Sequence, residues 1–297
     1  MTGAAGIIGV VLAECLLHRG YQVYAVVRPG SPHNSRILEH PNLILVPLLL
    51  KDIEKLPGCI TSPCDAMIHL AWSSARNDFV LQHESFEYAW KVVDVAKTIG
   101  CKRFLGIGSQ AEYGIRHKVT DEESPLCPIT PYGAFKAAAF HVTKIRAEQQ
   151  NIGWIWGRIF SAYGGYEPKT SLLSYLISSL KSGKEPMLTE ATQLWDYLYV
   201  EDAAEAILAL LEHGKDGNAY NIANGDVHPL RYFVEQVREH IAPKIAVHYG
   251  GKADLAISLI PSVEKIQQDT GWKAKVSFRE GIRRMASLAV LIGTHQN

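Results

Sequence analysis

The sequence lacks the features that mark several other classes of protein. Its 297 residues include no apolar run of about 18, and the N-terminus has no charged-then-apolar leader, so we expect neither a membrane span nor a secretory signal. The sequence has 30 basic residues (Lys and Arg) and 30 acidic residues (Asp and Glu), so its formal net charge is zero. This balance argues against a cluster of positive charge on one face. Nucleic acid and membranes are therefore not expected partners.

Disulfide and metal-binding patterns are also missing. The five cysteines are odd in number, and Cys59 and Cys64 stand too far apart for a C-x-x-C pair. None of the twelve histidines has the spacing of metal ligands, and His69 is expected to be a packed residue of a strand. We therefore expect reduced thiols, no metal site and a cytoplasmic protein.

What is present is a globular composition, 47% hydrophobic and 20% charged, in which short apolar segments alternate with longer helical ones. Strands are expected over 21–27, 42–50, 65–71, 103–108 and 153–159, and helices over 10–19, 86–100 and 132–150. This alternation is typical of βαβ units and predicts an α/β fold with a doubly wound parallel sheet.

The rest of the chain is organised around the glycine-rich turn Thr2-Gly-Ala-Ala-Gly-Ile-Ile-Gly9. Gly3 and Gly6 would let the backbone approach a pyrophosphate, Gly9 would let the next helix pack close to the sheet, and that helix's N-terminus would offer N–H groups to the anion. A buried strand should precede such a turn, whereas only Met1 precedes Thr2. Either the true start lies upstream, or this version lacks the strand that belongs in the middle of the sheet.

The alternation loosens after about residue 162. Helices are still expected over 171–181, 200–213, 230–241 and 278–292, with a short strand over 219–223, but polar stretches separate them. We therefore predict a dinucleotide-binding domain over 1–162 and a smaller substrate-binding lobe over 163–297, with a soft boundary and interleaved segments.

Three residues could carry chemistry. Tyr132 and Lys136 are spaced i and i+4 on one helix face, and a lysine beside a tyrosine lowers the pKa of the phenol, making it usable as an acid or base. Ser109 directly follows the strand expected over 103–108 and therefore lies at the carboxyl edge of the sheet, where doubly wound folds bind ligands. Its hydroxyl could bond a substrate oxygen while Tyr132 moves the proton.

With these residues the sequence resembles the extended short-chain dehydrogenase/reductases, in particular the NAD(P)-dependent epimerase/dehydratase branch that acts on nucleotide sugars. The matching motifs are Thr2-Gly-x-x-Gly-x-x-Gly9, His69-Leu-Ala71, Gly108-Ser109 with Tyr113-Gly114, Tyr132-x-x-x-Lys136, Arg158 to Gly164 and Gln193 to Asp202. The resemblance implies a Rossmann-like fold and hydride exchange with a nicotinamide ring, most often through a 4-keto sugar.

The resemblance also implies roles for individual residues. Tyr132 would be the acid/base, Lys136 would hold the cofactor ribose, and Ser109 would orient the sugar oxygen. The cofactor-binding set would be Gly3, Gly6, Ile7, Ile8, Gly9, Arg28, Ser31, Leu70, Ala71, Tyr132 and Lys136. The substrate-binding set would be Ser109, Gln110, Ser161 and Trp195.

One departure from the family pattern narrows the reaction. Family 4,6-dehydratases carry an Asp-Glu pair after the catalytic Ser or Thr, and here those positions are Gln110 and Ala111. Neither side chain can move a proton at C5 or C6, so we expect reduction or epimerisation rather than 4,6-dehydration. The remaining carboxylate, Glu112, is expected to be structural.

Cofactor choice depends on the end of the second strand. NAD enzymes place an acid there for the ribose 2′-OH, and NADP enzymes place an Arg nearby for the 2′-phosphate. Arg28 with Ser31 stands here, and no acid occurs until Glu39. This favours NADP(H), which suits a reductase, with NAD(H) as the alternative because an epimerase of this family would more often hold NAD.

The substrate lobe departs from the family in two places. Ser161 stands where an Asn often contacts the sugar nucleotide, and Trp195 replaces an arginine that would help to hold a phosphate. Trp195 could stack on a base or pack in the core. The substrate is therefore expected to differ from the common UDP- and dTDP-hexoses, or to be held differently.

Two alternative functions remain open, and the resemblance also implies an oligomeric state. The chain could reduce a non-nucleotide carbonyl compound, or it could be a non-catalytic dinucleotide-binding sensor or scaffold. The intact Ser109, Tyr132 and Lys136 argue against a sensor, which needs no proton relay. From the resemblance we expect a homodimer formed through a four-helix bundle of the helices over 86–100 and 132–150.

Overall fold

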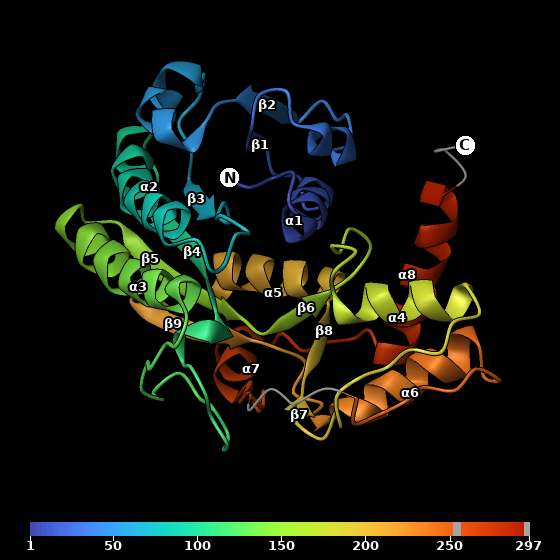
Figure 1. Ribbon diagram of the computed structural model, residues 1–297. Coiled ribbons are helices and arrows are strands. Elements are labelled where there is room, and N and C mark those ends of the chain that lie inside the picture. The colour runs from blue at the N-terminus through green and yellow to red at the C-terminus, as the bar shows by residue number, and fades with distance from the viewer. Residues whose placement is uncertain (252–256, 294–297) are drawn as a thin grey trace.

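The centre of the protein is a parallel sheet, seen in a computed structural model that describes residues 1–251 and 257–293 (Figure 1). Four strands lie side by side in the order β3 (Ala66–His69), β4 (Arg103–Ser109), β5 (Gly153–Ile159) and β9 (Asn218–Ile222). A second parallel pair consists of β1 (Val23–Val27) and β2 (Leu43–Pro47). The expected α/β fold with a doubly wound parallel sheet is thus confirmed.

The first two residues join these two parts of the sheet. Thr2 forms parallel bridges with Val26 on one side and with His69 on the other. The ammonium of Met1 donates to the carbonyl of Tyr24 at 2.7 Å, and burial lowers the pKa of this amine to about 6. Next to Met1 a cavity of about 460 Å³ separates β1 from β3. Two residues therefore occupy the central position where we expected a strand.

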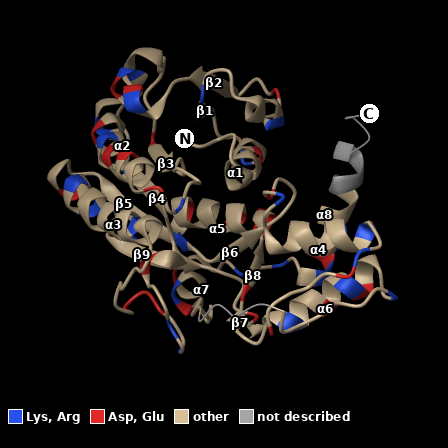
Figure 2. Ribbon diagram, in the orientation of Figure 1, with Lys and Arg blue, Asp and Glu red and all other residues tan. Residues whose placement is uncertain are grey.

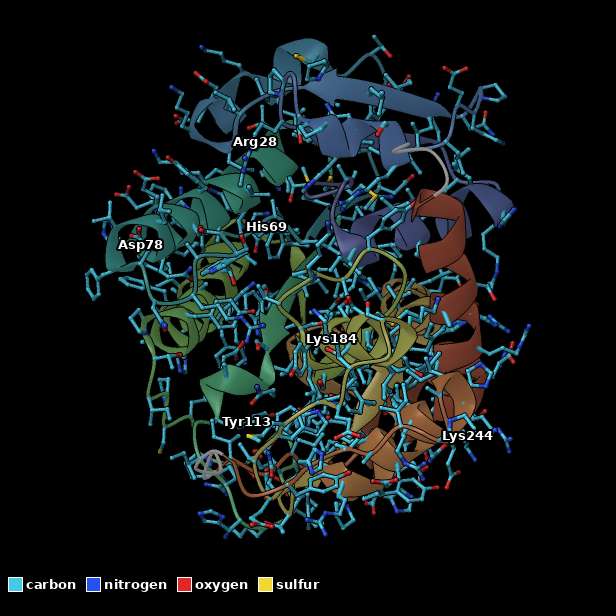
Figure 3. All side chains as sticks on the ribbon, turned by 45° about the vertical axis from the view of Figure 1, so that its right-hand side comes forward. Arg28, His69, Asp78, Tyr113, Lys184 and Lys244 are labelled. Carbon is cyan, nitrogen blue, oxygen red and sulfur yellow. The ribbon has the colours of Figure 1, made fainter. Side chains whose placement is uncertain are left out.

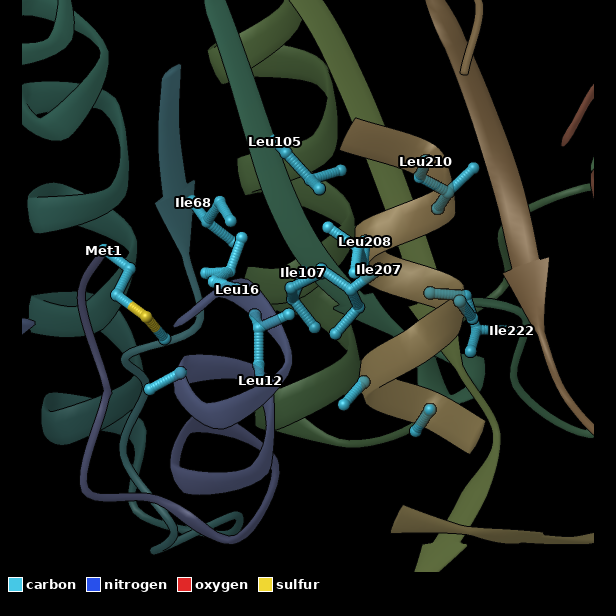
Figure 4. Close-up of a cluster of buried hydrophobic side chains, with 14 of the residues drawn as sticks. Met1, Leu12, Leu16, Ile68, Leu105, Ile107, Ile207, Leu208, Leu210 and Ile222 are labelled. Carbon is cyan, nitrogen blue, oxygen red and sulfur yellow. The ribbon is translucent and has the colours of Figure 1, made fainter. Parts of the chain in front are cut away.

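Helices cover both faces of the sheet (Figure 1). One face carries α2 (Phe79–Thr98) and α3 (Pro131–Gln149), and the other carries α1 (Ile7–His18) and α5 (Val200–His213). The apolar side chains between α1, α5 and the sheet form one buried cluster, shown in Figure 4 with Met1, Leu12, Leu105, Ile207 and Ile222 among its members. Burying both faces requires the nearly continuous apolar strands that the sequence has.

Helix boundaries follow local caps. The Asp78 carboxylate accepts a hydrogen bond from Leu81 N–H and starts α2 seven residues earlier than the expected residue 86. The first turn of α2 exposes Phe79 and Val80, so its apolar residues do not follow the core-facing period from which the start was inferred. Thr130 caps α3 with Pro131 in its first turn, close to the expected start.

The C-terminal part builds a smaller lobe and also returns to the sheet. Its own strands pair as β6 (Ser161–Tyr163) with β8 (Tyr197–Tyr199), and β7 (Leu194–Trp195) with β10 (His228–Pro229). Its helices are α4 (Leu172–Lys181), α6 (Leu230–Ile241) and α8 (Phe278–Gly293). Because α5 and β9 lie in the main domain, the segments of the two parts are interleaved. The division into domains over 1–162 and 163–297 stays a prediction. Residues 252–256 and 294–297 of the predicted lobe lie outside the described residues.

Shorter elements complete the chain. The 3-10 helices are η1 (Pro32–Arg36), η2 (Leu50–Cys59) and η3 (Gln110–Glu112), and a short helix α7 (Glu264–Thr270) packs beneath α5. The sequence interpretation missed η2 and α7, which are too short to show a helical period. Positive and negative side chains are interspersed over the helices in Figure 2. Among the described residues, no helix is long and apolar enough to cross a membrane.

Candidate active site

The glycine-rich turn lies at the carboxyl edge of the sheet, between Thr2 and α1. Gly3 has a positive φ of +72°, and a Cβ there would lie 2.7 Å from the backbone nitrogen of Ala71. A Cβ on Gly9 would overlap the carbonyl oxygen of Gly3. The turn therefore has room for glycine alone at these two positions, and the N-terminus of α1 with Ile7 and Ile8 follows it directly.

The end of β3 is tied to this turn. The Thr2 hydroxyl and Nδ1 of His69 are 2.8 Å apart, and Leu70 N–H donates to the Thr2 carbonyl at 3.3 Å. Burial lowers the pKa of His69 to about 3, with the nearby Lys136 ammonium as the next cause, so the ring is neutral. Leu70 and Ala71, both predicted to bind the cofactor, thus lie against the glycine turn.

Ser109 ends β4 and is buried above an ion pair. Its N–H donates to the Glu112 carboxylate at 2.8 Å, and Arg158 Nε donates to the same carboxylate at 2.7 Å. Arg158 and Glu112 are 1% and 0% exposed, and Trp156 Nε1 donates a further hydrogen bond to Glu112. Glu112 is therefore structural in the fold, as expected, and it fixes the backbone that carries Ser109.

The network continues away from Ser109. Arg158 donates to the Tyr113 hydroxyl at 2.9 Å, and that hydroxyl donates to Asn221 Oδ1 at 2.7 Å. The Asn221 amide in turn donates to the carbonyl of Thr120. Strands β4, β5 and β9 are in this way joined by buried polar side chains at one edge of the sheet. In Figure 3, Arg28, His69 and Tyr113 mark this side of the molecule from top to bottom.

Tyr132 and Lys136 share a face of α3, and each makes a contact that the sequence does not reveal. Burial raises the pKa of Tyr132, while the charge of Arg76 and a hydrogen bond with Ser109 partly lower it. Lys136 Nζ donates to the Ile107 carbonyl at 2.5 Å. Burial lowers the pKa of Lys136 to about 7, against the attraction of Glu112. The Arg76 guanidinium lies 4.6 Å from the centre of the Tyr132 ring, and its charge favours the phenolate.

The predicted 2′-phosphate site lies at the end of β1. Arg28 is exposed, and its carbonyl accepts hydrogen bonds from Ser31 N–H at 3.2 Å and from the Asn34 amide at 3.0 Å. The Ser31 hydroxyl caps η1 by accepting from His33 N–H. The turn is thus folded on itself with the Arg28 side chain outward.

The residues predicted to bind substrate fall into two places. Gln110 opens η3 beside Ser109, whereas Ser161 and Trp195 lie together in the lobe, where Trp195 Nε1 donates to the Ser161 hydroxyl at 3.0 Å. Trp195 is half-buried and packs against two apolar clusters of the lobe. In this structure the indole therefore packs, which is one of the two alternatives that the sequence left open.

The sequence interpretation missed the loop between β3 and α2. Trp72 and Arg76 in this loop contact Lys136 and Tyr132, respectively, and Gln82 of α2 holds the loop in place. Their positions in the sequence carry no motif, because the loop reaches α3 only in three dimensions. Arg76 therefore becomes a candidate functional residue only when the structure shows its contact with Tyr132.

Comparison with known proteins agrees with the fold. The model of the NAD dependent epimerase/dehydratase family matches residues 1–223, and the chain belongs to this family. It is an enzyme of the extended short-chain dehydrogenase/reductase type, as the resemblance implied.

Characterised relatives have several activities. A dTDP-glucose 4,6-dehydratase of Haemophilus influenzae is 27% identical over 74% of this chain and 74% of its own. A CDP-abequose synthase of Salmonella muenchen is 23% identical over 97% of this chain and 96% of its own. A UDP-glucose 4-epimerase of Streptomyces lividans is 24% identical over 92% of this chain and 90% of its own. The relatives thus include 4,6-dehydratases as well as 4-epimerases.

Solved structures share the fold over the whole chain. The UDP-glucose 4-epimerase of Thermotoga maritima superposes with a TM-score of 0.86 at 22% identity, covering 98% of both chains. A UDP-N-acetylglucosamine 4-epimerase of Methanobrevibacter ruminantium gives a TM-score of 0.87 at 21% identity, covering 98% of this chain and 97% of its own.

Proposed function

We propose that this protein either reduces a 4-keto nucleotide sugar or epimerises a nucleotide sugar through a 4-keto intermediate, in which the hydride is first removed and then returned. The observation that carries the proposal is that the first turn of α3, which carries Tyr132, packs against the turn that follows Ser109, at the carboxyl edge of the sheet. Ser109 would orient the sugar oxygen and Tyr132 would exchange its proton. The nicotinamide cofactor would supply or accept the hydride, and the glycine turn with Leu70 and Ala71 would hold it.

The proposal leaves out 4,6-dehydration, although some relatives catalyse it. That reaction needs further proton-transfer groups beside the catalytic serine, and Gln110 and Ala111 offer none. Glu112 is nearest in sequence, but its carboxylate is fully buried and occupied by Arg158, Trp156 and the backbone of Ser109. The burial and pairing of this carboxylate support leaving 4,6-dehydration out of the proposal.

For the cofactor we propose NADP(H) ahead of NAD(H). Arg28 is exposed at the end of β1, and Arg36 ends η1 close by. No carboxylate stands between residues 28 and 38 to receive a ribose 2′-hydroxyl. The family description names NAD, which is why both cofactors enter the test.

The test combines cofactor titration with product analysis. Purified protein is titrated with NADPH and NADH by fluorescence, and then incubated with UDP-, dTDP- and CDP-linked hexoses and their 4-keto forms. Selective NADPH binding and reduction of a 4-keto sugar nucleotide would support the proposal. Loss of water from a sugar nucleotide would contradict the exclusion of dehydration, and turnover of free ketones alone would favour the reductase of non-nucleotide carbonyl compounds.

We further propose a homodimer formed through α2 and α3. These helices pack together and leave apolar side chains on their outer surface, including Phe79 and Val80 at 65% exposure and Ile145 at 55%. Covering them against a second copy would bury this surface. Light scattering should give twice the monomer mass for the unmodified protein and the mass of one monomer for Val80→Asp. A monomeric unmodified protein would contradict the proposal.

A further inference from the structure

One loop contacts both members of the Tyr132–Lys136 pair. The Lys136 ammonium lies 3.9 Å from the centre of the Trp72 ring, and the Arg76 guanidinium lies 4.6 Å from the centre of the Tyr132 ring. A cation over an aromatic face is attracted by the ring's negative centre. The four side chains thus form two cation–π pairs, one for each residue with a predicted role.

The position of Arg76 is held from both sides. Its backbone carbonyl accepts a hydrogen bond from Tyr132 N–H at 3.1 Å, which ties the loop to the first turn of α3. From α2, the fully buried Gln82 accepts from Trp72 Nε1 at 2.6 Å and donates to the carbonyls of Ser73 and Ala75. Because these bonds fix the backbone of Arg76 and of the residues before it, its contact with Tyr132 is built into the fold.

The charges that face Tyr132 come from three elements. Glu112 lies behind Ser109 and disfavours the phenolate, but Arg158 is paired with it. Lys136, on the same helix, points to the Ile107 carbonyl. Arg76 is exposed, and within the described residues no carboxylate forms an ion pair with it. The Arg76 guanidinium is thus a cation stacked on the Tyr132 ring that no carboxylate of the described residues neutralises.

We propose that Arg76 is a positioning residue for Tyr132, which it holds by stacking and whose phenolate it stabilises. This inference rests on the proposed function in one respect, that Tyr132 is the group that exchanges the substrate proton. In that exchange the phenolate takes the hydroxyl proton and becomes the phenol, while Arg76 keeps its own protons throughout. Trp72 and Gln82 contribute by fixing the loop.

The test measures the ionisation of residue 132 without any substrate. 3,5-Difluorotyrosine, whose phenol is more acidic than that of tyrosine, is placed at position 132, and its ¹⁹F resonance is followed from pH 5 to 10 in the full chain. Arg76→Gln should raise the titration midpoint by roughly 1 unit, the usual effect of one adjacent charge, and Arg76→Lys should keep most of the original value.

The matched control is Arg231→Gln, which removes a second arginine stacked on a tyrosine, Tyr249, at 4.0 Å in the distant lobe. It should leave the midpoint unchanged. An Arg76→Gln midpoint equal to that of the unmodified protein would overturn the inference, as would an equal shift in the control. Because this readout needs no turnover, a protein that failed to act on any nucleotide sugar would contradict the proposed function and leave the result for Arg76 intact.

Discussion

The backbone N–H of Ser109 donates to the Glu112 carboxylate across 2.8 Å, and both residues are buried. The same carboxylate pairs with Arg158 of β5 at 2.7 Å. Residues at the ends of β4 and β5 therefore donate hydrogen bonds to the same buried carboxylate, next to the serine predicted to orient the substrate. The position of Ser109 depends on a group that never needs to touch substrate.

Glu112→Gln should strongly destabilise the protein, because Arg158 would remain buried without a counter-charge. Removing one partner of such a pair costs roughly 3–5 kcal/mol of unfolding free energy. The double variant Glu112→Gln with Arg158→Met should recover part of the loss. Urea denaturation measures both, and Asp52→Asn, which breaks the exposed Asp52–Lys55 pair, serves as the control expected to show little change. Equal effects of the buried and exposed changes would contradict this reading.

Tyr132→Phe should abolish most turnover and weaken cofactor binding far less, because Tyr132 is one of eleven residues predicted to bind the cofactor. The substitution removes the hydroxyl that exchanges the proton, and general acid–base catalysis contributes about 10²- to 10⁴-fold to a rate. The ring and its contact with Arg76 remain, so the fold should be kept. Single-turnover rates and fluorescence titration separate the two effects. Turnover within a few-fold of the unmodified enzyme would assign the proton transfer to another group.

Gly9→Ala should disrupt the glycine turn. The added methyl would overlap the Gly3 carbonyl, so the start of α1 must shift, and overpacking of this kind costs roughly 1–3 kcal/mol. Gly58→Ala is the matched control, since no atom lies within 4 Å of its added methyl. Thermal melting and cofactor titration should both report a loss for Gly9→Ala alone. A variant at Gly9 that binds cofactor normally would show that the turn is looser than its geometry indicates.

Arg28→Glu should reverse the preference between the two cofactors. The carboxylate would bond a ribose 2′-hydroxyl and repel a 2′-phosphate, so NADPH affinity should fall about tenfold or more, equal to about 1.4 kcal/mol, while NADH affinity rises. Fluorescence titration gives both constants. Lys244→Glu, an exposed charge change in the lobe (Figure 3), should alter neither. Unchanged discrimination in Arg28→Glu would place the phosphate elsewhere.

Stability should fall in acid because His69 is buried as the neutral ring. Its pKa is lowered to about 3, mainly by burial, whereas in the unfolded chain the ring titrates near its usual 6.5. Between these values the unfolded state binds the extra proton, so stability is present above about pH 6.5 and is lost as the pH falls toward 3. At about 1.4 kcal/mol per unit, the full loss approaches 5 kcal/mol.

Urea midpoints of the unmodified protein and of His69→Asn at pH 7 and pH 4.5 measure this contribution. The variant should show a smaller drop, and His117→Asn, at an exposed histidine, should match the unmodified protein. The comparison between variants matters because burial raises the pKa of Asp196 to about 6, which acts in the opposite direction over the same range. An equal drop in His69→Asn would rule out His69 as the source.

The sequence alone determined the fold and the motifs of this protein. Apolar strands alternating with helices indicate a parallel sheet buried on both faces. The glycine spacing, Ser109 and the Tyr132–Lys136 pair are local patterns that can be found in the chain itself. The family membership follows from these same residues. Short elements such as α7 escaped because its seven residues make only about two turns, which do not establish a period.

Only the tertiary structure decided which groups act on one another. Lys136 and Tyr132 are neighbours on α3, yet Lys136 turns to β4 while Arg76, 56 positions before Tyr132, stacks on the phenol. Glu112 likewise finds Arg158 across two strands, and Trp195 finds Ser161 across the lobe. Charge and hydrogen bonding act over a few ångströms in space, and the distance between two side chains is set by how the sheet, the helices and their loops pack, which no local pattern in the sequence records.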